Sequence, residues 1–116
     1  MNFLEKLLGS NGGSPINKIN PKEAKENLNK DKNIIILDVR ESYEYAAGHI
    51  KNSKNISLRA INQSITNVLK NKNATIYVYC QSGSRSSQGC KILAKLGYTN
   101  VYNLGGISSW PYEIVK

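Results

Sequence analysis

One stretch in the first half of the 116-residue chain restricts its fold more than any other. Residues 34–39 read Ile-Ile-Ile-Leu-Asp-Val, an apolar run rich in β-branched side chains that is interrupted only by Asp38. A strand that lacks alternating polar positions is typical of a parallel sheet covered on both faces. We therefore expect residues 34–39 to form a central strand, in a chain long enough for one domain.

Further strands and helices are predicted to alternate around this strand. Helices are expected from Pro21 onward and over residues 42–47, 61–70 and 86–96, with extended segments after Ile16, near Ile56 and over residues 75–79 and 101–104. Asn20 suits a helix N-cap, and Gly48 and Gly97 suit helix ends. Strands that alternate with helices form right-handed β-α-β crossovers. The sequence thus predicts an α/β fold, a small parallel β-sheet of about five strands flanked by helices on both faces.

Residues 1–15 differ in composition from the rest of the chain. Residues 2–8 place three leucines at helical spacing, and residues 9–15 are mostly Gly, Ser and Asn. We expect a short amphipathic N-terminal segment and a flexible linker here, followed by one folded domain over residues 16–116. The apolar stripe could dock on the domain's own surface, or it could bind a partner or a membrane surface. The sequence leaves both roles open.

Composition narrows the classes of function. The formal charge of +8 is carried mostly by lysines spread along the chain, and neither an arginine-rich stripe nor a nucleic-acid-binding motif accompanies it, so we expect no nucleic-acid partner. The longest apolar run is far shorter than a membrane span, so we expect none. Two cysteines are too few for a disulfide framework, and no secretory leader opens the chain, which indicates a cytoplasmic protein. We expect no metal site and no cofactor, because the sequence has no ligand cluster.

The residue with the clearest chemical signal is Cys80, at the end of the strand predicted over residues 75–79. The next residues include a glycine and three serines ahead of a helix, so the chain has to turn tightly around the sulfur. Turned backbone presents consecutive N–H groups that bind anions, and the helix N-terminus adds the positive end of its dipole. Both effects favour a thiolate, so Cys80 is predicted to be a nucleophile near neutral pH.

Arg85 ends this loop with a fixed positive charge. Its planar guanidinium could bind two oxygens of an incoming sulfonate or sulfinate. The alternative is an ion pair with a carboxylate such as Asp38 or Glu44. The two roles are compatible, and the sequence does not decide between them.

Four segments, taken in order, resemble the rhodanese family over about residues 16–116. They are residues 38–41 with 44–50, residues 55–56, residues 79–86, and residues 104–106 with Trp110. The third segment resembles the active-site loop of the family, and the fourth resembles its closing motif. The sequence departs from the family pattern at Lys51, Asn52 and Ser57, where Pro, Gly and Pro are frequent, and these are turn positions away from the expected chemistry.

The resemblance implies a sulfurtransferase in which Cys80 accepts a sulfur atom as a persulfide and passes it on. The residues implied to form its anion cradle are Gln81, Ser82, Gly83, Ser84, Arg85 and Ser86. Asp38 and Arg40 would support the loop. The donor would be a small sulfur-containing anion such as thiosulfate, or a persulfide, and the acceptor would be cyanide, a thiol or a partner protein.

Other interpretations stay open beside this one. A phosphatase or arsenate reductase of the same fold is less favoured, because four residues separate Cys80 from Arg85 and the phosphatase-like loop is one residue longer. A redox or persulfide sensor that uses Cys80 is not distinguished by the sequence. His49, the single histidine, is expected to fasten a turn rather than to act as a base, and Cys90 is expected in the core rather than in a disulfide relay.

Overall fold

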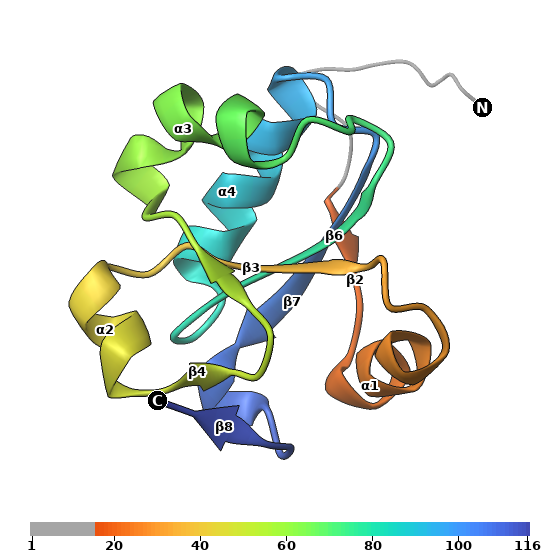
Figure 1. Ribbon diagram of the computed structural model, residues 1–116, viewed down its shortest axis with the longest axis vertical. Helices are drawn as coiled ribbons and strands as arrows, with labels where there is room; N and C mark the ends of the chain where they lie inside the picture. The colour runs from red at the N-terminus through yellow and green to blue at the C-terminus, as the bar shows by residue number, and fades with distance from the viewer. Residues whose placement is uncertain (1–15) are drawn as a thin grey trace.

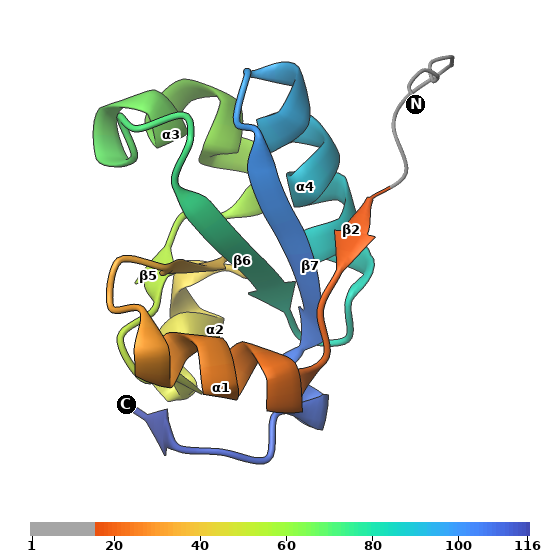
Figure 2. The same ribbon diagram turned by 90° about the vertical axis from the view of Figure 1, so that its right-hand side faces the viewer.

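A parallel sheet forms the centre of the molecule, as predicted. The computed structural model describes residues 16–116 (Figure 1 and Figure 2). Five strands pair in the order β2-β7-β6-β3-β5, and every pairing is parallel. Their bounds are Asn17–Lys18 (β2), Ile35–Asp38 (β3), Lys54–Asn55 (β5), Thr75–Cys80 (β6) and Asn100–Gly106 (β7). The segment and linker expected over residues 1–15 lie outside the described residues.

Helices cover both faces of the sheet. They are α1 (Pro21–Lys30), α2 (Ser42–Ala47), α3 (Ile61–Val68) and α4 (Ser84–Lys95), with short 3₁₀ turns at Leu58–Ala60 and Ile107–Ser109. Figure 1 and Figure 2 show α3 and α4 on one side of the sheet and α1 on the other. Helix α2 lies near the edge where β3 and β6 end (Figure 1). Within residues 16–116, no helix has the length and apolar character that crossing a membrane requires.

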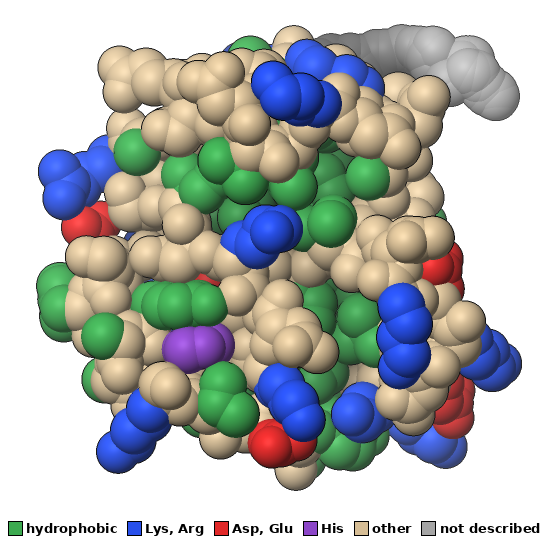
Figure 3. Space-filling model, in the orientation of Figure 1, with side chains coloured by type: hydrophobic (Ala, Val, Ile, Leu, Met, Phe, Trp, Pro, Cys, Tyr) green, Lys and Arg blue, Asp and Glu red, His purple; other side chains and the backbone are tan. Residues whose placement is uncertain are grey.

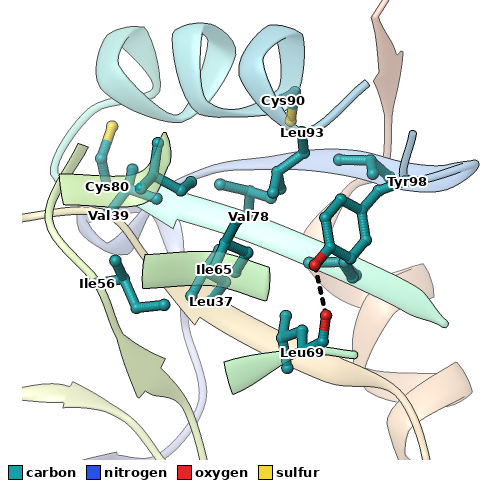
Figure 4. Close-up of a cluster of buried hydrophobic side chains, with 13 residues drawn as sticks. Leu37, Val39, Ile56, Ile65, Leu69, Val78, Cys80, Cys90, Leu93 and Tyr98 are labelled. Carbon is teal, nitrogen blue, oxygen red and sulfur yellow. Dashed lines mark hydrogen bonds between the residues drawn. The ribbon is translucent and has the colours of Figure 1, made fainter. Parts of the chain in front are cut away.

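The two-sided cover explains the unbroken apolar sequence of β3. Leu37 belongs to the buried cluster on the α3 and α4 side, together with Leu93 of α4 (Figure 4). Ile36 belongs to the cluster on the opposite side, together with Ala24 of α1 and Trp110. Because successive side chains of a strand point to opposite faces, both positions have to be apolar when both faces are covered.

Helix α1 begins where the sequence predicts it. Asn20 occupies the N-cap in an extended conformation, and Pro21 is the first helical residue. The Asn20 side chain accepts a hydrogen bond from the backbone N–H of Glu23 at 2.8 Å. This contact serves one of the N–H groups that the first turn of a helix leaves without a partner.

Several element boundaries differ from the prediction by one or two residues. Helix α4 begins at Ser84, two residues earlier than expected, because Gly83 takes the N-cap position with φ 111°. Strand β7 runs on through Gly106, and α3 ends at Val68. An additional antiparallel pair joins β4 (His49–Ile50) to β8 (Ile114–Val115). These two-residue strands are far apart in sequence, so no local pattern could predict their pairing.

Replacing Asn20 by alanine is expected to lower the free energy of unfolding by about 1 kcal/mol, because the N-cap hydrogen bond is lost. Urea denaturation followed by circular dichroism measures the change. The matched control is Asn29→Ala, an exposed position inside the same helix, which should leave stability unchanged or slightly higher. An equal loss in both variants would contradict the role of the cap.

Candidate active site

Cys80 lies at the end of β6, with its sulfur enclosed by the short loop that leads into α4. The backbone N–H of Gly83 donates to Cys80 Sγ at 3.0 Å, and that of Ser86 donates at 3.3 Å. The φ of 111° at Gly83 favours glycine and lets the chain reverse around the sulfur. Cys80 is only 1% exposed. The predicted turn is therefore present, and amides of the loop point at the sulfur.

The surroundings of Cys80 favour its thiolate. Burial opposes ionisation, but the hydrogen bond with the Ser86 side chain and donation from the loop amides outweigh it, so the pKa of the Cys80 thiol lies below its usual value. The N-terminus of α4 acts in the same direction through its dipole. Among residues 16–116 no hydrogen-bond donor to Cys90 is described, and burial raises the pKa of its thiol to about 12. Of the two cysteines, Cys80 is the one whose surroundings favour the thiolate.

A buried hydrogen-bond network joins Ser86 to strand β7. Ser86 Oγ donates to Asn103 Oδ1 at 2.7 Å and lies 3.5 Å from Cys80 Sγ. Asn103 Oδ1 also accepts the backbone N–H of Gly105 at 2.9 Å. Sequence reasoning missed Asn103, because nothing in its local sequence distinguishes it from the other asparagines of the chain. Only the pairing of β7 with β6 brings it next to the loop.

The backbone of strand β7 also packs closely against the loop that follows Cys80. An irregularity in the pairing of β6 with β7 places Cys80 opposite Gly106. A Cβ atom on Gly106 would lie 2.3 Å from Gln81 O and 2.6 Å from Ser82 Cα. Ser108 holds the same stretch, because its hydroxyl donates to Gln81 O at 3.0 Å. The loop therefore packs directly on the backbone at Gly106, and only glycine fits there.

Asp38 and Arg40 form a buried ion pair beside the loop. Arg40 Nε donates to both carboxylate oxygens of Asp38, at 3.1 and 3.0 Å, and Arg40 Nη2 donates to Asp38 Oδ2 at 2.8 Å. The same Nη2 donates to Gly48 O at 2.7 Å, and Nη1 donates to Gln81 Oε1 at 3.4 Å. The pair thus contacts the loop through the side chain of Gln81.

Arg85 pairs with Glu44 of α2. Arg85 Nη1 donates to Glu44 Oε1 at 2.7 Å, and Nη2 donates to Oε2 at 3.1 Å. Glu44 Oε1 also accepts the backbone N–H of Glu41 at 2.9 Å, which completes the capping box of α2. Hydrogen bonds from Arg85 and then from Glu41 outweigh burial and lower the pKa of Glu44 to about 2. The ion-pair interpretation of Arg85 is confirmed, with Glu44 rather than Asp38 as its partner.

Comparison with known proteins agrees with this geometry. The family model for a rhodanese-like domain matches residues 20–112. The chain belongs to the rhodanese family. Thiosulfate sulfurtransferase PspE of Escherichia coli is 38% identical over 80 residues, covering 69% of this chain and 77% of that protein. A sulfurtransferase of Allochromatium vinosum is 30% identical over 96 residues, covering 82% of this chain and 88% of that protein.

Solved structures show the same rhodanese fold. The structure of a rhodanese with anions from E. coli superposes with a TM-score of 0.68 at 35% identity, covering 72% of this chain and 98% of that one. A rhodanese-related protein from Thermoplasma volcanium gives a TM-score of 0.74 at 33% identity, covering 85% and 97%. The protein is thus a rhodanese-like member of a family of sulfurtransferases.

His49 and Cys90, which the sequence analysis considered as a base and as part of a disulfide relay, lie outside the Cys80 loop. His49 Nδ1 donates to Tyr45 O at 2.8 Å, and the two rings stack with centroids 3.7 Å apart, so His49 fastens the turn after Gly48 as expected. Cys90 packs in the hydrophobic cluster on the α4 side, and Figure 4 shows it well apart from Cys80. Neither side chain contacts the sulfur of Cys80 through a hydrogen bond described among residues 16–116.

Replacing Gly106 by alanine is expected to slow alkylation of Cys80 by iodoacetamide about tenfold or more, because the added methyl group displaces the loop and its amide donors. The free energy of unfolding should fall by about 1–3 kcal/mol from overpacking. The control is Gly89→Ala, whose Cβ would meet Val39 and Val78 at an ordinary 3.4 Å. Unchanged alkylation in Gly106→Ala would show that the loop is not held by this contact.

We expect the Glu44→Gln variant to lose less of its free energy of unfolding than the wild type when the pH is lowered. The pKa of Glu44 is about 2 in the folded protein against an ordinary 4.5, so its stabilising effect is complete above the ordinary value and disappears as the pH falls towards 2. Urea denaturation at about pH 7 and about pH 3 measures the difference between wild type and variant.

The control for this pH experiment is Glu113→Gln. Glu113 forms an exposed ion pair with Lys51 at 3.4 Å, and such pairs contribute little to stability. We expect this variant to follow the wild type. If Glu44→Gln and the wild type lose the same amount of unfolding free energy in acid, the Glu44 carboxylate does not cause that loss.

Proposed function

We propose that this protein transfers sulfane sulfur through a persulfide on Cys80. The observation that carries the proposal is the set of donors around Cys80 Sγ, with the N–H of Gly83 at 3.0 Å and the N–H of Ser86 at 3.3 Å. Donors gathered around one sulfur stabilise an anion there, whether it is the thiolate or the outer sulfur of a persulfide. Membership of the rhodanese family supports the same reaction.

The first half-reaction loads Cys80. Its thiolate attacks the outer sulfur of thiosulfate, a new S–S bond forms, the S–S bond of thiosulfate breaks, and sulfite leaves with the bonding electrons. In the second half-reaction, cyanide or a thiolate attacks the outer sulfur of the persulfide, and Cys80 leaves as a thiolate. Neither step moves a proton. This agrees with the engagement of His49 in a structural hydrogen bond.

The cradle residues divide into two groups in this mechanism. Gly83 and Ser86 supply amides to the reacting sulfur. Gln81, Ser82 and Ser84 are exposed around the loop and are proposed to contact the donor. Asp38 and Arg40 are proposed to support the loop through Gln81.

Arg85 is proposed to bind the oxygens of the donor without leaving its ion pair. Glu44 takes one N–H from each terminal nitrogen of Arg85, and a guanidinium has five N–H groups, so others stay available. The Glu44 pair would also hold the guanidinium in one orientation beside the loop. Binding to sulfonate oxygens therefore needs little rearrangement.

The proposed donor is a small sulfur-containing anion, with thiosulfate supported by the name of the E. coli relative. The proposed acceptor is cyanide, a thiol or a partner protein. The net charge of +8 raises the concentration of small anions near the protein, and the face in Figure 3 carries its Lys and Arg side chains scattered rather than in one patch. A cytoplasmic location belongs to this proposal, because a reducing compartment keeps Cys80 a free thiol.

Replacing Cys80 by serine is expected to abolish sulfur transfer with little change in stability, because serine nearly matches cysteine in size but is a poor nucleophile. Intact-mass analysis after incubation with thiosulfate should show the gain of one sulfur atom in the wild type, and cyanide should remove it. Cys90→Ala is the matched control and should load like the wild type.

Three outcomes would overturn the proposal. Sulfur that maps to Cys90 would exclude Cys80 as the carrier. Ready oxidation of Cys80 without persulfide formation from any donor would favour a redox sensor. Robust turnover of aryl phosphates or arsenate would favour the phosphatase-like chemistry.

A further inference from the structure

The Ser86 hydroxyl is a buried group that faces more acceptors than it has protons. Ser86 is 0% exposed. Its Oγ lies 2.7 Å from Asn103 Oδ1, 3.0 Å from Gly83 O, 3.4 Å from Gly105 O and 3.5 Å from Cys80 Sγ. A hydroxyl has one proton and fully serves one acceptor at a time. The choice among these acceptors therefore affects the sulfur directly.

The two nearest oxygen atoms around this hydroxyl already have other donors. Gly83 O accepts the backbone N–H of Ser87 at 3.1 Å at the start of α4. Asn103 Oδ1 accepts the backbone N–H of Gly105 at 2.9 Å, and this contact fixes the orientation of the amide, because its nitrogen could not accept. The contact between Ser86 and Asn103 is the shortest of the set. The hydroxyl proton therefore rests on Asn103 while Cys80 is a neutral thiol.

Ionisation of Cys80 changes which acceptor the proton of the Ser86 hydroxyl stabilises most. As a thiol, Cys80 can donate its own proton to Ser86 Oγ. As a thiolate, it has lost that proton and gains from every donor, and a hydrogen bond to a charged acceptor is stronger than one to a neutral acceptor. Ser86 can serve the thiolate only by turning its proton away from Asn103. In a persulfide the charge lies on the outer sulfur, so the proton can return to Asn103.

We propose that Asn103 is a positioning residue that competes with Cys80 Sγ for the proton of Ser86. By holding this proton, Asn103 disfavours the free thiolate relative to the persulfide, in which Sγ no longer carries the charge. A thiol or other acceptor then removes the outer sulfur of the persulfide more slowly, because Cys80 is a poorer leaving group. The statement about the persulfide rests on the proposed function, whereas the competition for the proton does not.

The pH profile of Cys80 alkylation by iodoacetamide tests the competition without any sulfur donor. Asn103→Ala is expected to increase the alkylation rate about three- to tenfold at pH values below the thiol pKa, because the nearest competing acceptor is removed and the charged thiolate is a stronger acceptor than the neutral carbonyl of Gly83. Ser86→Ala should decrease it. In the Ser86→Ala background, Asn103→Ala should have no further effect, since no proton remains to compete for.

Asn100→Ala is the matched control for this cycle. Asn100 also lies in β7 and donates to Thr75 Oγ1 at 2.6 Å, at the opposite end of β6 from Cys80. We expect it to leave the alkylation profile unchanged. If Asn103→Ala does not fold, Asn103→Leu preserves more volume while removing the acceptor, and the same cycle is run with that variant.

Two alkylation results would overturn the proposal. The first is a slower rate in Asn103→Ala or Asn103→Leu, which would mean that Asn103 only maintains the loop. The second is an effect of equal size in the Ser86→Ala background, which would mean that Ser86 does not mediate it. Neither result depends on whether the protein carries sulfur.

Discharge of the loaded protein to cyanide tests the persulfide statement. Asn103→Ala should lose its sulfur about three- to tenfold faster than wild type, because the departing thiolate is better stabilised. Unchanged or slower discharge would overturn this statement even if the alkylation cycle succeeds. Failure of the wild type to load from any donor would instead reject the proposed function, and alkylation alone would then decide the role of Asn103.

Discussion

Donation from backbone N–H groups to one buried sulfur is the interaction on which the rest of this site depends. The amides of Gly83 and Ser86 reach Cys80 Sγ only because the chain reverses at Gly83, and the same reversal starts α4 at Ser84. Burial alone would favour the neutral thiol, as it does at Cys90. The donors therefore decide the ionisation, and any change that moves the loop changes the chemistry of the sulfur.

Three neighbouring strands hold the loop because parallel strands end at one edge of a sheet. Strand β3 ends at Asp38, whose ion pair with Arg40 contacts Gln81. Strand β6 ends at Cys80, and β7 supplies the backbone at Gly106 against which the loop packs. These contacts hold the loop backbone around the sulfur, and the side chains of Gln81, Ser82 and Ser84 are exposed.

Much of this structure could be predicted from sequence, and the limits follow from the range of the interactions. The central strand, the cap at Asn20 and the turn after Cys80 depend on residues close in sequence, so local patterns revealed them. The choice of Glu44 as the partner of Arg85 joins residues 41 positions apart, and two carboxylates were equally plausible partners. Asn103 and the demand for glycine at position 106 depend on the register of β7 against β6, which no local pattern specifies.

The position of β7 has a consequence for the order in which the protein becomes functional. Strand β2, at the beginning of the described chain, lies at the sheet edge beside β7, with Asn17 opposite Tyr102. During synthesis, Cys80 emerges from the ribosome before the residues that complete its surroundings, and domains form long-range strand pairs slowly. A nascent chain that ends before Gly106 contains Cys80 but lacks the β7 backbone against which the loop packs. The surroundings of Cys80 are therefore completed only by β7, the last strand in chain order of the five-stranded sheet.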